Sequence, residues 1–599
     1  MPLITSSKTQ PEYDVIIVGS GAGGGQMAYT LTLAVLKCVM LEAGRSYVPA
    51  TQTAMFHRPN QTPLMNMPTP DKQMGFTDAT VDGGWEIPGE PYTQASPNPK
   101  EQFSWWRPRM LGGRTNHWGR MSLRNGPYDF KPRSRDGLGL DWPISYEDVE
   151  PYYTKVEMLI GVFGTNEGRE NTPNSPDGVL LPPPKGRASE LLMQKHAKKL
   201  GIPVISIHRA VLTRPLDAST IPAKLHPGNP KAQQIVADSM RARAACFWAT
   251  DCHRGCGIGA NYQSTTVHLP PALATGNLDI IPNAHAREVT LGVDGRANGV
   301  VFIDKTTGQE ARVKAKAVVL AASSGETVRI LLNSKSAQFP QGLANRSGRV
   351  GKYIMDSVGT GVGGQVPVLE NLPPHNEDGA GGPHFYIPWW LYQEQLAGKL
   401  GFPRGYHVEF NGSRPMPGGN NPLPEDLAHG AYGTKFKEEA RRYYGSFVGY
   451  GCRGEMIPND DSFAELDAEV KDKWGIPVLR WHWKWSENEL RMVDHAAQTL
   501  TSIIEAMGGK ARSRKGATGR DNIEQGGKVI HEVGGALMGA EAAMSVCNGW
   551  NQTWDVKNLF LCDGSPFASN ADKNPTLTIM ALAWRAGDHI IELARKGEL

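Results

Sequence analysis

The sequence predicts a chain of mixed α/β and α+β class, in which a discontinuous, doubly wound α/β domain carries a second, sheet-based domain. A strand–turn–helix unit begins near residue 14, and segments of the same kind return in the middle and at the end of the chain. The stretches between them are rich in Gly, Pro and Asn, with short alternating segments typical of a sheet. With 599 residues, two domains are expected rather than one core.

A glycine-rich turn follows the first apolar strand, residues 14–18. It supplies the pattern G-x-G-x-x-G: Gly19 allows the tight turn, Gly21 lets the backbone approach a pyrophosphate, and Gly24 lets helix and strand pack closely. A helix-like run and a second strand follow, and that strand ends at Glu42, a position where a carboxylate accepts ribose hydroxyls. The unit predicts a Rossmann-type site for FAD or NAD, and its place at the start of a long chain favours FAD.

Further strands complete this domain in the prediction, at residues 278–281, 299–303, 317–320 and 558–562. A long helix with apolar periodicity is expected over residues 577–594. The FAD-binding domain is therefore expected to take residues 1–155, 240–345 and 515–599. The substrate domain is expected to take residues 156–239 and 346–514, including an alternating, half-exposed strand over residues 477–485.

The composition argues against several classes of protein. The formal net charge of +3 gives no reason to expect a nucleic-acid partner. The most apolar stretch, residues 15–41, is interrupted by glycines and by Lys37, so no transmembrane segment is expected. The first residues are polar, and we expect no signal peptide in this chain.

Two polar residues near the end suggest chemistry. His531 follows an apolar, strand-like pair, and Asn574 precedes Pro575 at an expected helix start. One reading is structural: Asn574 caps the helix and His531 is a satisfied core histidine. The other is catalytic, because oxidation of a C–OH group needs a base for the hydroxyl proton while hydride leaves the carbon, and imidazole suits that task. Asn574 would then hydrogen-bond the same oxygen.

These motifs resemble the glucose–methanol–choline (GMC) oxidoreductases, especially their pyranose-oxidase and sugar-dehydrogenase branch. The resemblance rests on the N-terminal turn, on His531 and on the run NPTLTIMALAWRAGDHI that begins at Asn574. It implies the GMC fold, with His531 and Asn574 as the catalytic pair. It also places Asp563 and Thr576 at the flavin and Val289 near the adenine.

A second region of resemblance spans residues 109–118. Gly112 and Gly113 let the backbone pass close to a ring system, and Asn116 and His117 follow them. In the pyranose-oxidase branch a histidine before tryptophan is linked covalently to the flavin, and His117 occupies that place. Asn116 departs from the threonine of pyranose oxidase, so His117 either carries the covalent bond or packs beside the flavin.

Three cysteines, Cys246, Cys252 and Cys256, have the spacing C-x5-C-x3-C. They are buried unliganded thiols, a zinc site or the ligands of an iron–sulfur cluster, and three thiolates suit a three-iron form. The spacing resembles that of bacterial sugar dehydrogenases of the family, which carry a 3Fe-4S cluster. Such a cluster would split the flavin's electron pair for a cytochrome acceptor.

Sugar contacts are less clearly marked. Glu455 lies before the alternating strand and would bind two sugar hydroxyls, or else is a solvated loop acid. Trp481, Trp483 and Trp485 share one face of that strand and either stack on sugar rings or, more commonly, cover the core.

The resemblance implies oxidation of a secondary sugar hydroxyl to a ketone, as in glucoside 3-dehydrogenase, with hydride passing to flavin N5. The alternatives are activities like those of gluconate 2-dehydrogenase or fructose dehydrogenase, an oxygen-using pyranose or glycoside oxidase, and a non-redox flavoprotein lyase. A small subunit bearing a twin-arginine signal and a c-type cytochrome are the expected partners. Export with that subunit would place the chain in the periplasm; the alternative is the cytoplasm.

Overall fold

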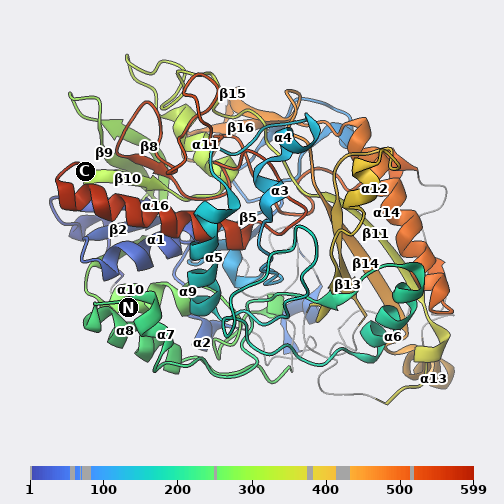
Figure 1. Ribbon diagram of the computed structural model, residues 1–599. Coiled ribbons are helices and arrows are strands. Elements are labelled where there is room, and N and C mark those ends of the chain that lie inside the picture. The colour runs from blue at the N-terminus through green and yellow to red at the C-terminus, as the bar shows by residue number, and fades with distance from the viewer. Residues whose placement is uncertain are drawn as a thin grey trace.

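The computed structural model describes residues 3–53, 61–67, 69, 82–248, 252–373, 382–412, 432–512 and 518–599. Two sheets dominate it. In Figure 1 the first sheet lies with the C-terminal helix on one side of the molecule, and the second lies with helix α14 on the other. Segments from both ends of the chain and from its middle build the first sheet, so this part of the molecule is discontinuous in sequence.

The first sheet has seven described strands in the order β7-β2-β1-β10-β9-β8, with β18 also pairing with β10. Its parallel part consists of β1 (Tyr13–Val18), β2 (Cys38–Glu42), β7 (Leu278–Pro282), β18 (Leu559–Leu561) and the second half of β10 (Gln309–Leu320). These strands are nearly continuous runs of buried Val, Ile and Leu, which is typical of a sheet covered on both faces.

Strand β10 belongs to two kinds of pairing. Its first half pairs antiparallel with β9 (Ala297–Asp304), and β9 pairs with β8 (Ala284–Leu291). Its second half pairs parallel with β1 and β18. The strands predicted at residues 299–303 and 317–320 are therefore present as β9 and β10, and both are longer than expected.

Helices cover the first sheet. Helix α1 (Ala22–Leu33) follows the glycine turn and packs against α16 (Thr576–Lys596), which also contacts α5 (Tyr146–Ile160). Helix α1 begins at Ala22, so the glycines of the turn themselves enter the helix, and it ends before Val35, whose φ of 73° is left-handed.

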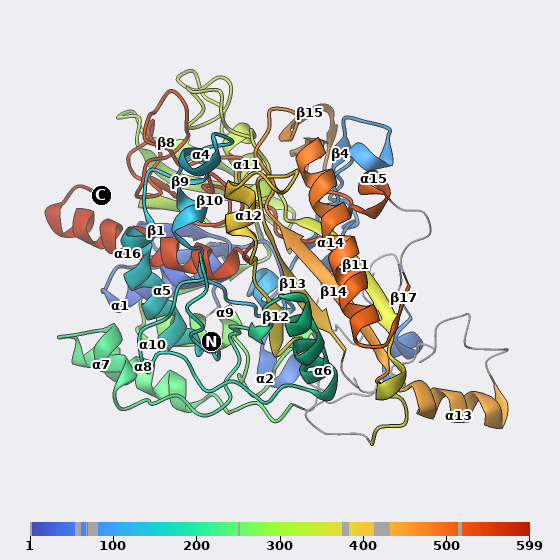
Figure 2. The ribbon, with the colours of Figure 1, turned by 45° about the vertical axis from the view of Figure 1, so that its right-hand side comes forward.

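The second sheet has the strand order β17-β11-β14-β13-β12-β6. Helix α14 (Glu487–Ala506) lies along β11, β14 and β17 and contacts α6 (Ala188–Ala197), as Figure 2 shows. The strands are β6 (Ile205–Ser206), β11 (Val358–Gln365), β12 (Phe385–Ile387), β13 (Tyr406–Asn411), β14 (Phe447–Gly454) and β17 (Lys510–Arg512).

A smaller sheet joins β15 (Phe463–Lys471), β16 (Pro477–His482) and β4 (Thr93–Gln94). The strand predicted over residues 477–485 is thus present but ends at His482. Trp481 and Trp483 are buried, and the Trp481 ring stacks on Phe103 at 4.4 Å between centroids. The structure therefore favours the core-covering reading of these tryptophans over sugar stacking.

The remaining elements are short or peripheral to the two main sheets. They are α2 (Pro49–Gln52), α3 (Pro127–Phe130), α4 (Pro132–Asp136), α7 (Ile221–Leu225), α8 (Pro230–Arg241), α9 (Ser264–Val267), α10 (Leu269–Ala274), α11 (Ser324–Asn333), α12 (Tyr392–Leu396), α13 (Gly433–Tyr443), α15 (Gly519–Asn522), β3 (Gly83–Gly84) and β5 (Arg107–Pro108).

The strands divide as the predicted domains do. Those of the first sheet lie within residues 1–155, 240–345 and 515–599, and those of the second within 156–239 and 346–514. The pairing of β4 with β16 crosses between the two groups. The exact domain boundaries remain a prediction. None of the described helices is both long and apolar enough to cross a membrane.

Candidate active site

A cavity of about 470 Å³ connects the glycine turn after β1 to His531 and Asn574. Its walls come from both main sheets, so it lies where the two halves of the molecule meet. The lining segments are 18–23, 41–43, 106–109, 113–115, 117–119, 121, 284–286, 321–324, 326, 330, 409, 453, 529–532, 563–564, 574–576 and 579.

The glycine turn is shaped for a ligand. A Cβ atom on Gly19 would lie 2.3 Å from the Ala321 carbonyl oxygen, and one on Gly24 would lie 1.9 Å from the Gly19 carbonyl oxygen. A Cβ on Gly21 would meet no described protein atom within 4 Å. Gly19 and Gly24 are therefore required by packing, whereas Gly21 leaves the backbone at the N-terminus of α1 open to the cavity, as pyrophosphate binding requires.

Glu42 lies in the cavity wall at the end of β2. Its carboxylate accepts hydrogen bonds from the Ser20 backbone at 3.2 Å, from the Ser20 hydroxyl, and from the Gly44 backbone at 2.7 Å. Burial raises the pKa of this carboxyl. The residue is therefore held rigidly where the prediction places a ribose.

Arg107 brings a positive charge to the same end of the cavity. Its guanidinium packs on the rings of Trp105 and Tyr92, at 4.4 and 5.1 Å from the centroids. None of its three nitrogens has a hydrogen-bond partner among the described residues, and burial lowers its pKa to about 10. A buried cation without polar partners fits a site for an anionic dinucleotide such as FAD.

Val289, the predicted adenine contact, lies outside the cavity wall. Val289 is buried in the core, donates its backbone N–H to Ser334 Oγ at 2.8 Å, and does not line the cavity. Ala286, on the same strand, does line it. A register irregularity between Ala286 and Glu288 leaves Ala286 opposite Phe302 and Val289 opposite Val300, so both lie on the same face of β8, but Val289 is farther along the strand than the cavity reaches.

In the segment 109–118, which contains the paired glycines, some residues line the cavity and others hold the turn in place. Gly113 and His117 line the cavity. Gly112 is left-handed (φ 92°) and donates its N–H to Ser20 Oγ at 2.8 Å. Asn116 is fully buried and donates to the Leu111 carbonyl at 2.9 Å. Neither Gly112 nor Asn116 lines the cavity, so the structure assigns them to shaping the turn rather than to direct contact with a cofactor.

His117 presents a neutral imidazole to the cavity. Its Nε2 atom accepts a hydrogen bond from Trp106 Nε1 at 2.9 Å, and its Nδ1 atom has no partner among the described residues. Burial, followed by the nearby Arg120 and Arg114, lowers the pKa of His117 to about 3. Both readings of His117, covalent attachment and packing beside a flavin, require this position at the cavity.

His531 and Asn574 meet in the cavity wall. Asn574 Nδ2 lies 3.3 Å from His531 Nε2, and His531 Nδ1 lies 3.0 Å from Ser357 Oγ. The strand expected before His531 is wrong: residues 527–530 form a turn, with Ile530 at φ 63°. This turn, together with a hydrogen bond from the His531 backbone to Asp356 at 2.9 Å, orients the imidazole.

Asn574 is more than a helix cap. Helix α16 begins at Thr576, and no side chain caps it. The Asn574 amide is instead directed at His531 and at Glu409, whose Oε1 accepts from Nδ2 at 3.0 Å. Burial, followed by the Arg453 guanidinium, lowers the pKa of His531 to about 3, so the imidazole is unprotonated at neutral pH.

Glu409 and Arg453 are cavity residues that the sequence analysis missed. They lie on neighbouring strands β13 and β14 and form an ion pair at 3.6 Å, with His407 Nε2 3.4 Å from the same carboxylate. The sequence contains one signal for Glu409: polar and apolar residues alternate over residues 406–410, which is typical of a strand with one polar face.

Asp563 and Thr576 both line the cavity, as predicted for flavin contacts. The Asp563 carboxylate accepts from the Ser565 backbone at 2.8 Å and from Thr327 Oγ1 at 2.5 Å, and burial raises its pKa. Thr576 is the first residue of α16. The N-terminus of this long helix therefore meets the cavity beside Asn574.

Glu455 does not occupy the predicted place. It is only 1% exposed and is absent from the cavity wall, so neither a sugar contact nor a solvated loop acid describes it. Its carboxylate lies 3.4 Å from Arg404 and 3.6 Å from Arg135. The loop after β14 folds inward to these arginines, which the sequence pattern does not reveal.

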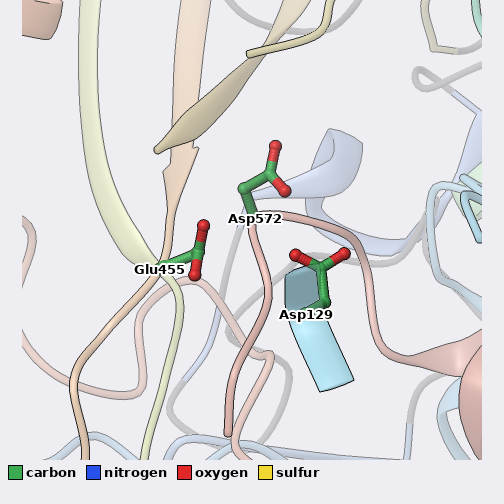
Figure 3. A group of neighbouring side chains, drawn as sticks. All are labelled: Asp129, Glu455 and Asp572. Carbon is green, nitrogen blue, oxygen red and sulfur yellow. The ribbon is translucent and has the colours of Figure 1, made fainter. Parts of the chain in front are cut away.

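Glu455 belongs to a cluster with Asp129 and Asp572, whose ligand atoms all lie within 4.8 Å of one another. Figure 3 shows the three carboxylates gathered from three separate segments. Lys573 pairs with both aspartates, at 3.1 Å from Asp129 and 2.5 Å from Asp572. Lys573 and the two arginines near Glu455 form ion pairs with these three carboxylates, and both arginines also contact Asp136, so ion pairs within the fold account for the cluster.

The three cysteines border one buried region. Cys252 begins a short 3₁₀ helix (Cys252–Arg254), and burial, followed by the neighbouring Cys252, raises the pKa of the Cys246 thiol to about 12. Among the described residues, three ligand atoms lie within 4.8 Å of one another only in the acidic cluster. The sulfurs of Cys246, Cys252 and Cys256 do not meet this criterion, so they are too far apart to bind one zinc ion together.

Buried arginines surround the cysteines. Arg120 donates to the carbonyl of Cys252 at 2.9 Å and to that of Asn116 at 3.0 Å. Arg243 likewise donates to carbonyl oxygens, and Arg209 Nη2 lies 3.5 Å from Cys252 Sγ. Arg120 and Arg243 have no carboxylate partner in the described part of the chain. The region therefore carries uncompensated positive charge.

Comparison with known proteins gives matches over most of the chain. The family models of GMC oxidoreductases match residues 13–359 and 458–583. The chain is 28% identical over 590 residues to the 2-methyl-1,2-propanediol dehydrogenase of Mycolicibacterium austroafricanum, covering 96% of this chain and 95% of that protein. It is 28% identical over 600 residues to the fructose dehydrogenase large subunit of Gluconobacter japonicus, covering 98% of each.

A solved structure agrees with the architecture. The crystal structure of pyridoxine 4-oxidase from Mesorbium loti matches with a TM-score of 0.59, over 96% of this chain and 99% of that chain. The sequence identity is 13%, so this likeness shows the fold alone. The predicted fold class, a Rossmann-type FAD domain combined with a sheet-based domain, is confirmed.

Proposed function

The chain belongs to the GMC oxidoreductase family, whose members bind FAD, and from this premise we propose that it is an FAD-dependent dehydrogenase that oxidises a secondary hydroxyl of a sugar to a ketone. One observation carries the proposal: His531 and Asn574 share a cavity with the glycine turn, although they come from distant segments. The whole-length relatives named for dehydrogenation of a diol and of fructose support a polyol substrate.

The residues divide the work between binding and proton transfer. The bound FAD would accept the hydride from the sugar carbon. Its pyrophosphate would be held by Gly19, Gly21 and the N-terminus of α1, and its ribose by Glu42. His531, unprotonated at neutral pH, takes the hydroxyl proton, and Asn574 hydrogen-bonds the same oxygen.

The test is anaerobic reduction of the purified flavoprotein by a panel of glucose, methyl glucosides, fructose and gluconate, followed by NMR of the product. Bleaching of the flavin with formation of a keto sugar is the expected result. Rapid recolouring in air would show an oxidase instead. A flavin that stays yellow with every sugar and alcohol would overturn the proposal and favour a lyase.

We also propose that Cys246, Cys252 and Cys256 hold a 3Fe-4S cluster, which would carry electrons singly from the flavin to a c-type cytochrome. The buried charge of Arg120 and Arg243 supports this, because a cluster held by three thiolates is anionic. Iron and sulfide assays with EPR test it. Cys252→Ser should lose iron while keeping FAD, and a native protein without iron would overturn it.

A covalent bond from His117 to FAD is a further part of the proposal. Support comes from the cavity position of His117 and its neutral imidazole. After denaturation in acid the flavin should remain with the protein, and His117→Ala should release it. Release of all flavin from the native chain would leave His117 as a packing residue.

For the partners, we propose a small subunit with a twin-arginine signal and export of the complex to the periplasm. The name of the Gluconobacter relative, a large subunit, supports the existence of other subunits. Cell fractionation and purification of the native complex test this. A chain found alone in the cytoplasm would contradict it.

A further inference from the structure

We infer that Glu409 is a positioning residue that fixes the direction of the hydrogen bonds between Asn574 and His531, and thereby keeps His531 Nε2 free to accept a proton. The inference rests on the proposed function, since it concerns the same oxidation site. Nothing in the sequence pattern around the catalytic pair points to Glu409, which lies 165 residues before Asn574.

The four side chains form one continuous row. Glu409 Oε1 lies 3.0 Å from Asn574 Nδ2, which lies 3.3 Å from His531 Nε2. His531 Nδ1 lies 3.0 Å from Ser357 Oγ. The direction of each hydrogen bond in this row depends on that of its neighbour, because an amide has one accepting and one donating end.

Glu409 is the fixed end of the row. An ionised carboxylate only accepts hydrogen bonds. Although burial alone would raise it, the Arg453 guanidinium and the contact with His407 hold the pKa of Glu409 well below its usual range. Its position is also rigid, because strand pairing of β13 with β14 places His407 opposite Arg453.

The carboxylate determines the orientation of the Asn574 amide. The NH₂ group must face Glu409, since a carbonyl oxygen there would meet only another acceptor. The same NH₂ group faces His531 Nε2, so this nitrogen must carry its lone pair. The imidazole proton is then on Nδ1 and is donated to Ser357 Oγ.

The opposite arrangement would be inactive. If the amide were reversed, its oxygen would face His531 and favour a proton on Nε2, the atom that must take the proton of the substrate hydroxyl. Asn574 Oδ1, by contrast, has no hydrogen-bond partner among the described residues. The row therefore presents to the substrate hydroxyl an unprotonated Nε2, which a hydroxyl proton can reach in place of the long 3.3 Å contact with Asn574 Nδ2, and an amide oxygen without a partner among the described residues.

The test compares Glu409→Gln and Glu409→Asp with the matched control Glu455→Gln, a buried carboxylate outside the cavity wall. Glutamine keeps the shape of glutamate but can present either end of its amide. We expect the limiting rate of flavin reduction in E409Q to fall about 10- to 100-fold, with little change in sugar affinity or FAD content. E409D should recover part of the rate, and E455Q should keep the native rate.

A second readout does not depend on activity. Diethyl pyrocarbonate acylates imidazole nitrogens that carry a free lone pair. In the native flavoprotein His531 Nε2 carries its lone pair, whereas a reversed Asn574 amide in E409Q would favour a proton on Nε2. Peptide mass spectrometry should therefore show several-fold slower labelling of His531 in E409Q than in the native protein, and native labelling in E455Q.

The outcomes separate this inference from the proposed function. If no sugar reduces the native flavin, the proposed function fails, and the labelling of His531 still decides the inference. Unchanged labelling and rate in E409Q would overturn it. A change in sugar affinity alone would make Glu409 a sugar contact, and a parallel loss of FAD and thermal stability would make it structural; both results overturn the positioning role.

Discussion

Two buried polar regions adjoin each other in this molecule, and they differ in how completely their groups are partnered. The acidic cluster of Asp129, Glu455 and Asp572 forms ion pairs with Lys573 and two arginines. The cavity instead contains groups without partners among the described residues, including the Arg107 guanidinium and the Asn574 carbonyl oxygen.

This contrast shows how a ligand site differs from a structural network. A cluster of buried carboxylates resembles a metal site, but here neighbouring lysine and arginine side chains pair with the carboxylates, so the cluster is a structural ion-pair network. Unpartnered buried groups are costly unless a ligand satisfies them. A buried charge without an ion-pair partner among the described residues, such as Arg107, rather than the density of charge, therefore marks the active site, and substitutions in the two regions should have separable effects.

The largest expected effect is on catalysis. His531→Ala should lower the limiting rate of flavin reduction about 10²- to 10⁴-fold, because the hydroxyl proton loses its acceptor. Stopped-flow reduction under anaerobic conditions measures this. FAD content and the thermal midpoint should stay near those of the native protein. An equal loss of stability would mean that the two regions are not separable.

The next effect is on stability. Lys573→Met leaves Asp129 and Asp572 without their shared cation and should reduce the free energy of unfolding by about 3–5 kcal/mol. Denaturant titration measures it. Lys155→Met, which removes a partly exposed partner of Asp588, serves as the control and should cost about 0–1 kcal/mol. A mild effect at Lys573 would show that the cluster is not paired as described.

Glu455→Gln should have a smaller effect of the same kind. The loss of charge opposite Arg404 and Arg135 should cost about 1–3 kcal/mol of stability. The KM for the sugar should not change, because Glu455 does not line the cavity. A raised KM without loss of stability would restore Glu455 as a sugar contact.

The smallest effect concerns pH. The pKa of His531 is lowered to about 3, so the base form is present above that pH and is lost only as the pH falls towards it. The rate of flavin reduction should therefore be constant between about pH 5 and 8, unlike that of an enzyme whose histidine keeps the ordinary value near 6.5. A clear titration near pH 6.5 would show that the histidine is less buried than described.

The sequence was most informative where function rests on local structure. The glycine turn before α1 and the start of α16 are each specified within a few residues, so Gly21 and Asn574 could be found by pattern alone. Glu409 could not, because its role depends on the pairing of β13 with β14 and on a distant asparagine. Nor does the pattern show how far along β8 the cavity extends, which is why Val289 was chosen and Ala286 was not.

Long-range folding also explains the misassigned Glu455, whose loop turns inward to arginines from other segments. The glycine-rich strand β11 lacks the alternation that identifies strands, so the sequence predicts a sheet-based domain without locating this strand. The polar face of β13 was readable in principle, yet it lay within that same region.

Arg120 has a consequence for how the holoprotein matures. Its guanidinium joins the Cys252 carbonyl to that of Asn116, beside His117, although the chain separates them by more than a hundred residues. The two segments therefore order together. If FAD and the proposed cluster both bind, loading of the cluster would help to order the FAD site, so iron-free C252S should keep FAD but release it at a lower temperature than the native protein.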